Sequence, residues 1–337
     1  LFVARDQELA KLDRFLAQAL GGQGQVAFIT GEAGSGKTEL MNEFARRATS
    51  EHPALLVAGG SCSVHTGIGD PYFPFREILE ILTGDVEGRW AAGAVGTEQA
   101  RELWRLLPQA AQVVAGQGPD LVNTFLHGTA LIDRLSAAGA ADTALIALLE
   151  SLSVRRPDMA GSAAAQQNDY FEQYARVLRT LADGRGLLLK IDDLQWADLG
   201  SISLHYHLGR QIAGAPILIL GAYRPEEIAL GQDGARHSLE TVVNELGRLF
   251  GDNRINLNEA KSREFVDRIL DSEPNRLGPS FRHLVLNQTR GNALFTIELL
   301  RSMQERGDLA KNDQGQWIEE EALDWERLPA RVEAVIA

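Results

Sequence analysis

A short segment near the start of the chain has the residue types and spacing needed to hold phosphate groups. Two glycines lie five positions apart, and a lysine and a threonine follow the second, in the order Gly31-Glu32-Ala33-Gly34-Ser35-Gly36-Lys37-Thr38. Glycines let the backbone wrap closely around a ligand and direct N–H groups at phosphate oxygens. In this P-loop pattern the lysine contacts the β- and γ-phosphates and the hydroxyl binds Mg²⁺. We predict that residues Gly31 to Glu39 bind nucleotide phosphates; the alternative is a chance glycine-rich turn.

An acidic pair follows an apolar run in the middle of the chain. The run Leu187–Ile191 ends in Asp192 and Asp193. Carboxylates at the carboxyl end of a buried strand lie at the sheet edge where ligands of α/β proteins bind. We predict that Asp192 belongs to the Mg²⁺ shell and that Asp193 orients or activates the attacking water. The alternative interpretation is that both aspartates cap the helix that follows.

The P-loop needs a strand before it and a helix after it, and the sequence predicts both. Continuous apolar runs are typical of parallel strands that are covered on both faces. The predicted strands are Gln25–Thr30, Ala54–Gly60, Leu187–Asp192, Pro216–Tyr223 and a weaker Arg254–Leu257. Leucines on one helical face also predict a first helix from Asp6 to Leu20. Strands that alternate with helical patterns indicate an α/β fold, a P-loop NTPase with a parallel five-stranded sheet.

Two helical regions accompany this predicted nucleotide-binding domain, which covers residues 1–257. Between the second and third strands, residues 65–168 are too many for one crossover, so we interpret them as a helical insertion. A helix from Tyr170 to Leu181 then returns the chain to the sheet. For residues 258–327 the helical pattern predicts a small lid domain. Short strands are expected on both sides of a turn at Asp313–Trp317.

The composition limits the classes of function. The chain has 337 residues, which predicts about two domains, and its 46 acidic and 33 basic residues give a net charge of −13. This balance argues against direct nucleic-acid contact, because phosphate backbones are bound by cationic faces. A single cysteine, Cys62, excludes an internal disulfide framework and favours a reducing, cytoplasmic location. No apolar run approaches the ~18 residues of a membrane span, and the start without methionine indicates a fragment of a longer chain.

Several segments together carry a resemblance to one family. The run Asp192–Asp198 is similar to an extended acidic motif, and Phe2–Leu9 is similar to that family's start, with Ala4 where glycine is usual. Further similar segments are Pro71–Phe75, Gly221–Arg224, Arg290–Leu300 with Ala293 in place of proline, and Leu328–Val332. The family is that of the signal-transduction ATPases with numerous domains, the STAND class. The chain most resembles the AAA-like ATPase module of large ATP-binding bacterial transcription regulators and related signalling proteins.

This resemblance implies a slow, regulatory ATPase that works as a nucleotide-dependent switch, with ATP or ADP and Mg²⁺ as cofactors. The N-terminal segment, including Val3 and Arg5, would lie over the adenine. Arg224 would face the γ-phosphate and would act in hydrolysis beside Lys37 and Asp193.

The resemblance also implies further parts and partners of the chain. Thr38 and Asp192 would be the metal ligands. Residues 328–337 would begin a winged-helix domain, and sensor and effector domains would follow in the same chain. Self-association would accompany ATP binding.

Other functions are compatible with a P-loop. A ring-forming AAA-type motor ATPase would need an arginine finger, for which Arg210 and Arg248 are candidates. A small-molecule kinase would need a substrate pocket in the insertion, and a scaffold would hold nucleotide without hydrolysis, which the acidic pair disfavours. The pair His205-x-His207 could bind a metal on a strand. Its surroundings predict a helix, where positions i and i+2 do not face each other, so we expect no metal site there.

Overall fold

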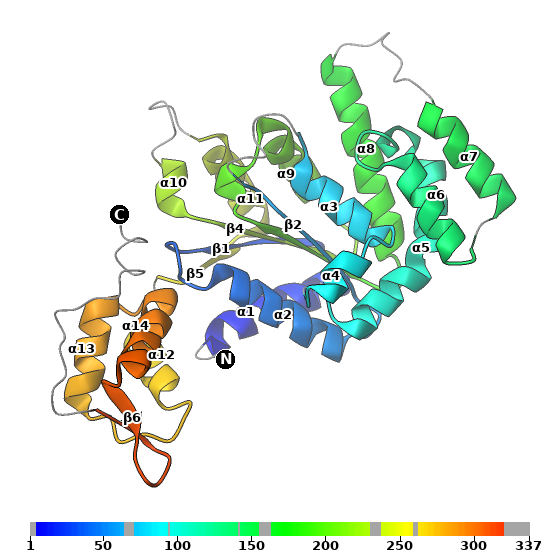
Figure 1. The fold of residues 1–337 in the computed structure, drawn as a ribbon. Helices are drawn as coiled ribbons and strands as arrows, with labels where there is room; N and C mark the ends of the chain where they lie inside the picture. Colours follow the sequence, from blue (N-terminus) through cyan, green and yellow to red (C-terminus); the bar gives the residue numbers. More distant parts are fainter. Residues whose placement is uncertain are drawn as a thin grey trace. The chain divides into compact units, whose positions relative to one another are not determined.

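The computed structural model describes residues 5–63, 71–93, 95–140, 142–154, 163–229, 237–258 and 262–319 (Figure 1). The chain forms two compact units, each built from segments that are distant in the sequence. The larger unit comprises Ala10–Ile29 and Met41–Ile255. The smaller unit comprises Leu1–Leu9, Thr30–Leu40 and Asn256–Ala337, so it groups the P-loop with the C-terminal helices. The predicted domain boundaries after residues 257 and 327 stay a prediction.

Five strands form a sheet in the order β2-β3-β4-β1-β5. Their bounds are Gln25–Thr30 for β1, Leu56–Ser61 for β2, Leu187–Asp192 for β3, Ile217–Tyr223 for β4 and Arg254–Asn256 for β5. β3 pairs in parallel with β2 on one side and with β4 on the other. All seven residues of β4 are buried, which is why this strand is a continuous apolar run. The predicted α/β fold with a parallel five-stranded sheet is confirmed.

The bounds of β2 differ slightly from the prediction. β2 begins at Leu56 rather than at Ala54. The Leu55 N–H donates to the carbonyl of His52 at 2.9 Å and closes a turn after the preceding helix. Ala54 therefore belongs to the turn, although its apolar side chain resembles the start of a strand.

Helices precede the strands, connect them and follow them along the chain. α1 covers Asp6–Leu20, as predicted, and α2 covers Lys37–Glu51. Between β2 and β3 lie α3 Phe73–Leu82, α4 Glu87–Ala91, α5 Thr97–Gln117, α6 Gly128–Ala137, α7 Thr143–Val154 and α8 Ala163–Ala182. α9 Leu199–Gln211, α10 Pro225–Ala229 and α11 Ser238–Phe250 complete the larger unit. The described residues between β2 and β3 are largely helical, and α5 to α8 lie together in Figure 1. The returning helix α8 begins before Tyr170, in an alanine- and glutamine-rich stretch without apolar periodicity.

An aromatic cluster joins the insertion to the rest of the larger unit. Tyr174 of α8 is fully buried, and its hydroxyl donates a hydrogen bond to the carbonyl of Phe75 in α3 at 2.7 Å. Its ring lies edge-on to Phe75, with centroids 5.8 Å apart, and 5.2 Å from the ring of Phe125. Burying a phenol without a hydrogen bond is costly, so this contact favours one arrangement of α3 and α8.

Three helices and a hairpin form the C-terminal part of the smaller unit. They are α12 Ser262–Leu270, α13 Pro279–Thr289 and α14 Ala293–Arg306, with the antiparallel strands β6 Leu309–Lys311 and β7 Trp317–Glu319. Val266, Phe281 and Met303 are buried in their common core. The predicted turn between two short strands is confirmed. Among the described residues, no helix has both the length and the apolar character that crossing a membrane requires.

Two histidines of α9 lie in different surroundings. His205 is fully buried, with its ring 5.6 Å from that of Phe28, and neither of its nitrogens has a hydrogen-bond partner among the described residues. His207 is half-buried, 3.4 Å from a carboxylate oxygen of Glu172. The described part of the chain contains no group of three or more side chains that could hold a metal ion. Burial lowers the pKa of His205 to about 4.

His205 is expected to make the fold sensitive to acid. Because the pKa is about 4 in the folded protein and 6.5 in the unfolded chain, the unfolded chain takes up a proton first as the pH falls. The free energy of unfolding should therefore decrease by about 3 kcal/mol between neutral pH and pH 4 through this residue alone. We expect His205→Leu to remove this part of the pH dependence in urea unfolding. His283→Leu, at an exposed position of α13, is the control, and an unaltered pH dependence in His205→Leu would contradict the prediction.

Candidate nucleotide-binding site

The P-loop lies between β1 and α2, as its spacing predicts. Gly34 and Gly36 have φ angles of 74° and 91°, in the left-handed region that favours glycine. Gly31 is favoured for another reason, because a Cβ atom there would lie 2.5 Å from the Oγ and 3.1 Å from the Cβ of Ser35, which would have to shift. A loop with this backbone presents consecutive N–H groups on its concave side, which suits a phosphate.

Lys37 begins α2, and its side chain turns back over the loop. The Nζ atom donates to the carbonyl oxygens of Gly31 and Glu32, both at 2.9 Å, and the residue is only 6% exposed. The Oγ of Ser35 is also buried and has no hydrogen-bond partner within the described ranges. Buried hydroxyls are normally paired, and a phosphate oxygen would accept a hydrogen bond from this one. The ammonium, the hydroxyl and the start of a 15-residue helix therefore fit an anion.

Arg5 connects the N-terminal segment to the P-loop. Its Nη2 donates to the carbonyl of Ser35 at 3.1 Å, and its Nη1 forms an ion pair with Glu8 at 3.0 Å. The guanidinium carbon lies 5.5 Å from the ring centre of Phe265. Arg5 is buried, and its hydrogen bond to the Ser35 carbonyl holds the backbone of the P-loop at that residue. The adenine contact predicted for Arg5 stays a prediction, and Val3 lies outside the described residues.

The carbonyl groups of the P-loop contact the start of α14. Asn292 donates from Nδ2 to the carbonyl of Ala33 at 2.9 Å, and the Leu294 N–H donates to the carbonyl of Gly34 at 3.0 Å. The Oδ1 of Asn292 also accepts from the N–H groups of Leu294 and Phe295, which caps α14. An asparagine before a helix predicts such a cap. The bond to the P-loop could not be predicted from the sequence, because it depends on tertiary structure.

Asn292→Ala should weaken both the smaller unit and its ligand site. We expect the loss of the cap to lower the free energy of unfolding by about 1 kcal/mol. The loss of the bond to Ala33 should weaken ATP binding by roughly fivefold, as calorimetry would show. Asn292→Asp is the matched variant, because it keeps the cap acceptor but has no donor for Ala33. It should keep the share of the stability that the cap contributes and still bind ATP more weakly; wild-type affinity in both variants would refute the role of this contact.

The acidic pair ends β3, as predicted, and its second aspartate has an uncommon backbone conformation. Asp193 lies in the left-handed region, with φ 52° and ψ 42°, and its N–H donates to the Oδ1 of Asp192 at 2.9 Å. The following helix α9 is capped by Asp198, whose Oδ1 accepts from the Ser201 N–H at 3.0 Å. This argues against the alternative interpretation, in which the acidic pair caps that helix.

Arg224 follows β4 and lies beside Asp193. Its Nη2 is 3.9 Å from the Oδ1 of Asp193, and its Nη1 is 2.7 Å from the Oε1 of Glu227. The side chain of Gln195 lies between the two strand ends, donating to Asp193 and accepting from the Arg224 N–H. The structure therefore brings together two of the predicted catalytic residues. It adds Gln195, whose contacts no pattern in the sequence predicts.

The carboxyl end of β2 and β3 has a negative local charge. Cys62 follows β2, and its thiol pKa is raised well above the ordinary value, first by burial and then by the carboxylates of Asp198, Asp193, Asp192 and Glu77. The thiol therefore stays protonated and unreactive at neutral pH. Carboxylates gathered in this way favour a cation, and their hard oxygen ligands are those that Mg²⁺ prefers.

The predicted metal ligands belong to different compact units. Thr38 is exposed in the first turn of α2, next to the exposed Glu39. Asp192 is half-buried at the end of β3. Both ligands offer oxygen atoms, which fits Mg²⁺, and the ion usually keeps several waters rather than a full set of protein ligands. Their joint coordination of the ion stays a prediction.

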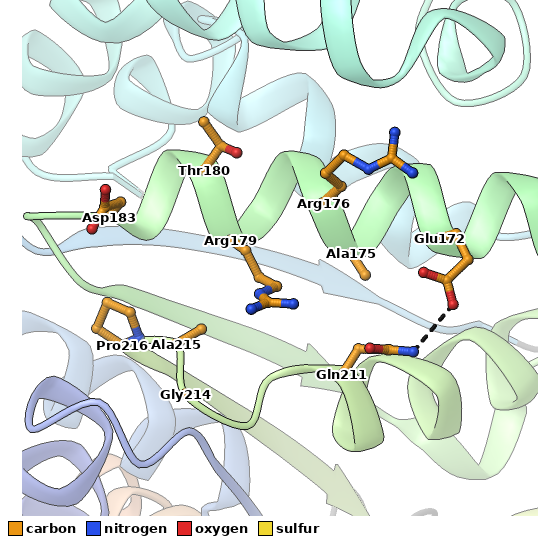
Figure 2. Close-up of a pocket in the computed structure, with 10 residues that line it drawn as sticks. All are labelled: Glu172, Ala175, Arg176, Arg179, Thr180, Asp183, Gln211, Gly214, Ala215 and Pro216. Atoms are coloured by element: carbon orange, nitrogen blue, oxygen red, sulfur yellow. Dashed lines mark hydrogen bonds between the residues drawn. The ribbon is translucent and has the colours of Figure 1, made fainter.

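The larger unit also contains a cavity that none of these motifs line. It has a volume of about 440 Å³ and is lined by α8 with Asp183 after it, by Gln211 at the end of α9 and by residues 214–216 before β4 (Figure 2). Gln211 of this lining donates to Glu172 at 3.1 Å. The lining residues at 214–216 lie just before β4, whereas Asp192 and Arg224 lie at or after the carboxyl ends of their strands. The cavity contains none of the predicted site residues, so we do not assign it to the nucleotide.

A strand, a glycine-rich loop, a helix that begins with lysine and an acidic strand end together define a P-loop NTPase. The AAA ATPase domain family matches residues 1–220, and the chain belongs to this family. The match includes the P-loop and the acidic pair and ends before Arg224.

Among solved structures, the chain is similar to the ORC1 protein of Aeropyrum pernix in complex with DNA. The sequence identity is 17% and the TM-score 0.41, and the similarity covers 91% of this chain and 61% of that chain. The chain therefore spans less than two thirds of that protein's length. No curated protein sequence matches the chain.

Proposed function

We propose that this chain binds ATP with Mg²⁺, hydrolyses it slowly and acts as a nucleotide-dependent switch in a multidomain regulator. The observation that carries the proposal is the left-handed backbone at Gly34 and Gly36 in front of a helix that begins with the buried Lys37. Membership of the AAA ATPase domain family supports nucleotide binding and ATPase activity in general. The STAND resemblance supports the regulatory, transcriptional role that is proposed here.

The P-loop residues would hold the phosphates. Backbone N–H groups and the start of α2 bind anions, and the ammonium of Lys37 would exchange its carbonyl partners for phosphate oxygens. The hydroxyl of Ser35 would donate to a further oxygen. Thr38 and Asp192 would hold Mg²⁺, which when bound neutralises charge on the phosphate oxygens.

The residues after β3 and β4 would act in hydrolysis. Asp193 would orient the attacking water and accept its proton. Arg224 would stabilise negative charge on the γ-phosphate. Its guanidinium is already engaged with Glu227 and Asp193, so it would have to give up at least one of these partners first. This cost supports a slow turnover.

The contact between the P-loop and α14 supports a switch. The carbonyls of Ala33 and Gly34 are bonded to Asn292 and Leu294, so a change in the loop backbone would change these bonds. A ligand shifts a conformational equilibrium only through contacts that differ between the states. ATP and ADP would favour different placements of the C-terminal helices in this way. Self-association with ATP and downstream sensor and effector domains complete the proposal and rest on the STAND resemblance.

Two measurements test the proposed function directly. The nucleotide released from the purified, denatured protein is expected to be ADP or ATP, and a guanine nucleotide would contradict the proposal. A phosphate-release assay should show slow ATP turnover that stops when a chelator removes Mg²⁺. Binding of ATP without any turnover would instead support a scaffold.

Membership of the AAA ATPase domain family also favours a second candidate, a ring-forming motor ATPase. The candidate arginine fingers lie on helices of the larger unit. Arg248 forms an ion pair with Glu245 at 2.6 Å, and the guanidinium of Arg210 lies 5.8 Å from the ring centre of Tyr206. Electron micrographs of closed rings in the presence of ATP, together with brisk turnover, would favour the motor over the switch.

A further inference from the structure

The side chain of Gln195 is buried between the ends of two strands and uses both ends of its amide. It is only 4% exposed. Its Nε2 donates to the Oδ1 of Asp193 at 2.7 Å, and its Oε1 accepts from the backbone N–H of Arg224 at 3.2 Å. A buried amide that is paired at both ends has one fixed orientation, because rotation would leave both of its partners unsatisfied.

The backbone around Gln195 is also held closely. Asp193 has a left-handed conformation, which is uncommon for a residue other than glycine and persists only when its surroundings enforce it. Leu194 is fully buried against β4, where a Cβ atom at Gly221 would lie 2.5 Å from its Cδ1. The turn after β3 therefore packs directly against β4. This places the amide of Gln195 within reach of Arg224.

Both contacts to the Asp193 carboxylate fall on one oxygen. Oδ1 accepts from Gln195 and lies 3.9 Å from the Nη2 of Arg224. The structure gives Oδ2 no hydrogen bond within the described part of the chain. A donor on one oxygen fixes the carboxylate plane and leaves the other oxygen available as an acceptor.

We infer that Gln195 is a positioning residue for ATP hydrolysis. It holds the Asp193 carboxylate in one orientation toward the attacking water. It also keeps that carboxylate at a fixed position relative to Arg224. This inference rests on the proposed function. A general base works only when it lies within hydrogen-bond reach of the proton it accepts, so loss of the positioning bond should lower the turnover without changing ATP binding.

Two variants change the bonds that Gln195 makes. Gln195→Met has a similar shape but no polar atoms, and Gln195→Glu keeps an acceptor for Arg224 but places a second carboxylate beside Asp193. Both variants should lower kcat by roughly tenfold to a hundredfold, with KM and the Kd for Mg-ATP unchanged. A wild-type kcat in Gln195→Met, which can bond to neither partner, would overturn the inference. Urea unfolding checks that the variants are folded.

A double-mutant cycle tests whether Gln195 acts through Asp193. In an Asp193→Asn background, Gln195→Met should cause little further loss of kcat, because the group that it positions no longer acts as a base. Independent, additive losses would indicate a general structural role and would overturn the inference.

The same measurements distinguish failure of this inference from failure of the proposed function. If the wild type hydrolyses ATP and Gln195→Met does so equally well, the inference alone falls. If the wild type binds ATP but does not hydrolyse it, the proposed ATPase function falls, and the positioning role falls with it.

Discussion

Replacing Lys37 with alanine is expected to abolish binding of Mg-ATP, with a loss of affinity of at least about a hundredfold. The ammonium is the one charged side-chain group of the P-loop that lies over the loop carbonyls, and it is buried there. Inside such a site a hydrogen bond between charged groups is roughly twice as strong as one between neutral groups. Nothing in alanine can replace that charge, so isothermal calorimetry should detect no binding at ordinary concentrations.

The variant also removes hydrogen bonds from the carbonyls of Gly31 and Glu32, so its folding needs a separate check. Urea unfolding should show a folded protein with a modest loss of stability. Lys11→Ala is a suitable control, because Lys11 also donates to a backbone carbonyl, that of Arg254 at 2.8 Å, and pairs with the exposed Asp252, but it is not part of the P-loop. Lys11→Ala should bind ATP as the wild type does. If Lys37→Ala kept its ATP affinity, the P-loop would not be the phosphate site and the proposed function would have to be abandoned.

Replacing Asp193 with asparagine is expected to leave ATP binding intact and to slow hydrolysis by about a hundredfold or more. Asparagine has nearly the same shape as aspartate and is among the residues that adopt the left-handed conformation most readily. Its amide oxygen can still accept from Gln195, so the turn after β3 should be preserved. What the variant loses is the negative charge and the ability to accept a proton from water.

The measurement for Asp193→Asn is a comparison of ATP affinity with phosphate release in the same preparation. Asp183→Asn is the control, because Asp183 is an exposed aspartate after α8 that lines the separate cavity. We expect wild-type turnover from the control. Full turnover from Asp193→Asn would exclude Asp193 as the base, whereas loss of binding would assign it to nucleotide or metal binding instead.

The family match covers some of the residues to which a role is assigned here and not others. The AAA ATPase domain family covers residues 1–220, so it includes Lys37, Asp193 and Gln195. Arg224 and the contact of Asn292 with the P-loop lie beyond or partly beyond it, and they depend on the structure and on the resemblance. The variants at Lys37 and Asp193 therefore test the ATPase itself, while Asn292→Ala tests the proposed link to the switch.

The sequence determined those features that depend on neighbouring residues. The bounds of α1 and β3 follow from apolar periodicity and from the change at the acidic pair, and both were predicted correctly. The positive φ angles of Gly34 and Gly36 follow from the absence of a side chain, which the P-loop spacing indicates. Local patterns of this kind can be recognised because each residue's contribution depends little on the rest of the fold.

Tertiary structure alone decided which distant residues meet. Gln195 reaches Arg224 across 29 positions because β3 and β4 are neighbours in the sheet, and no periodicity specifies the order of strands. Asn292 reaches Ala33 across 259 positions, and α9 buries His205 against Phe28 rather than exposing it. These contacts form because the packing of whole elements brings them together, so a sequence read one segment at a time contains no signal for them.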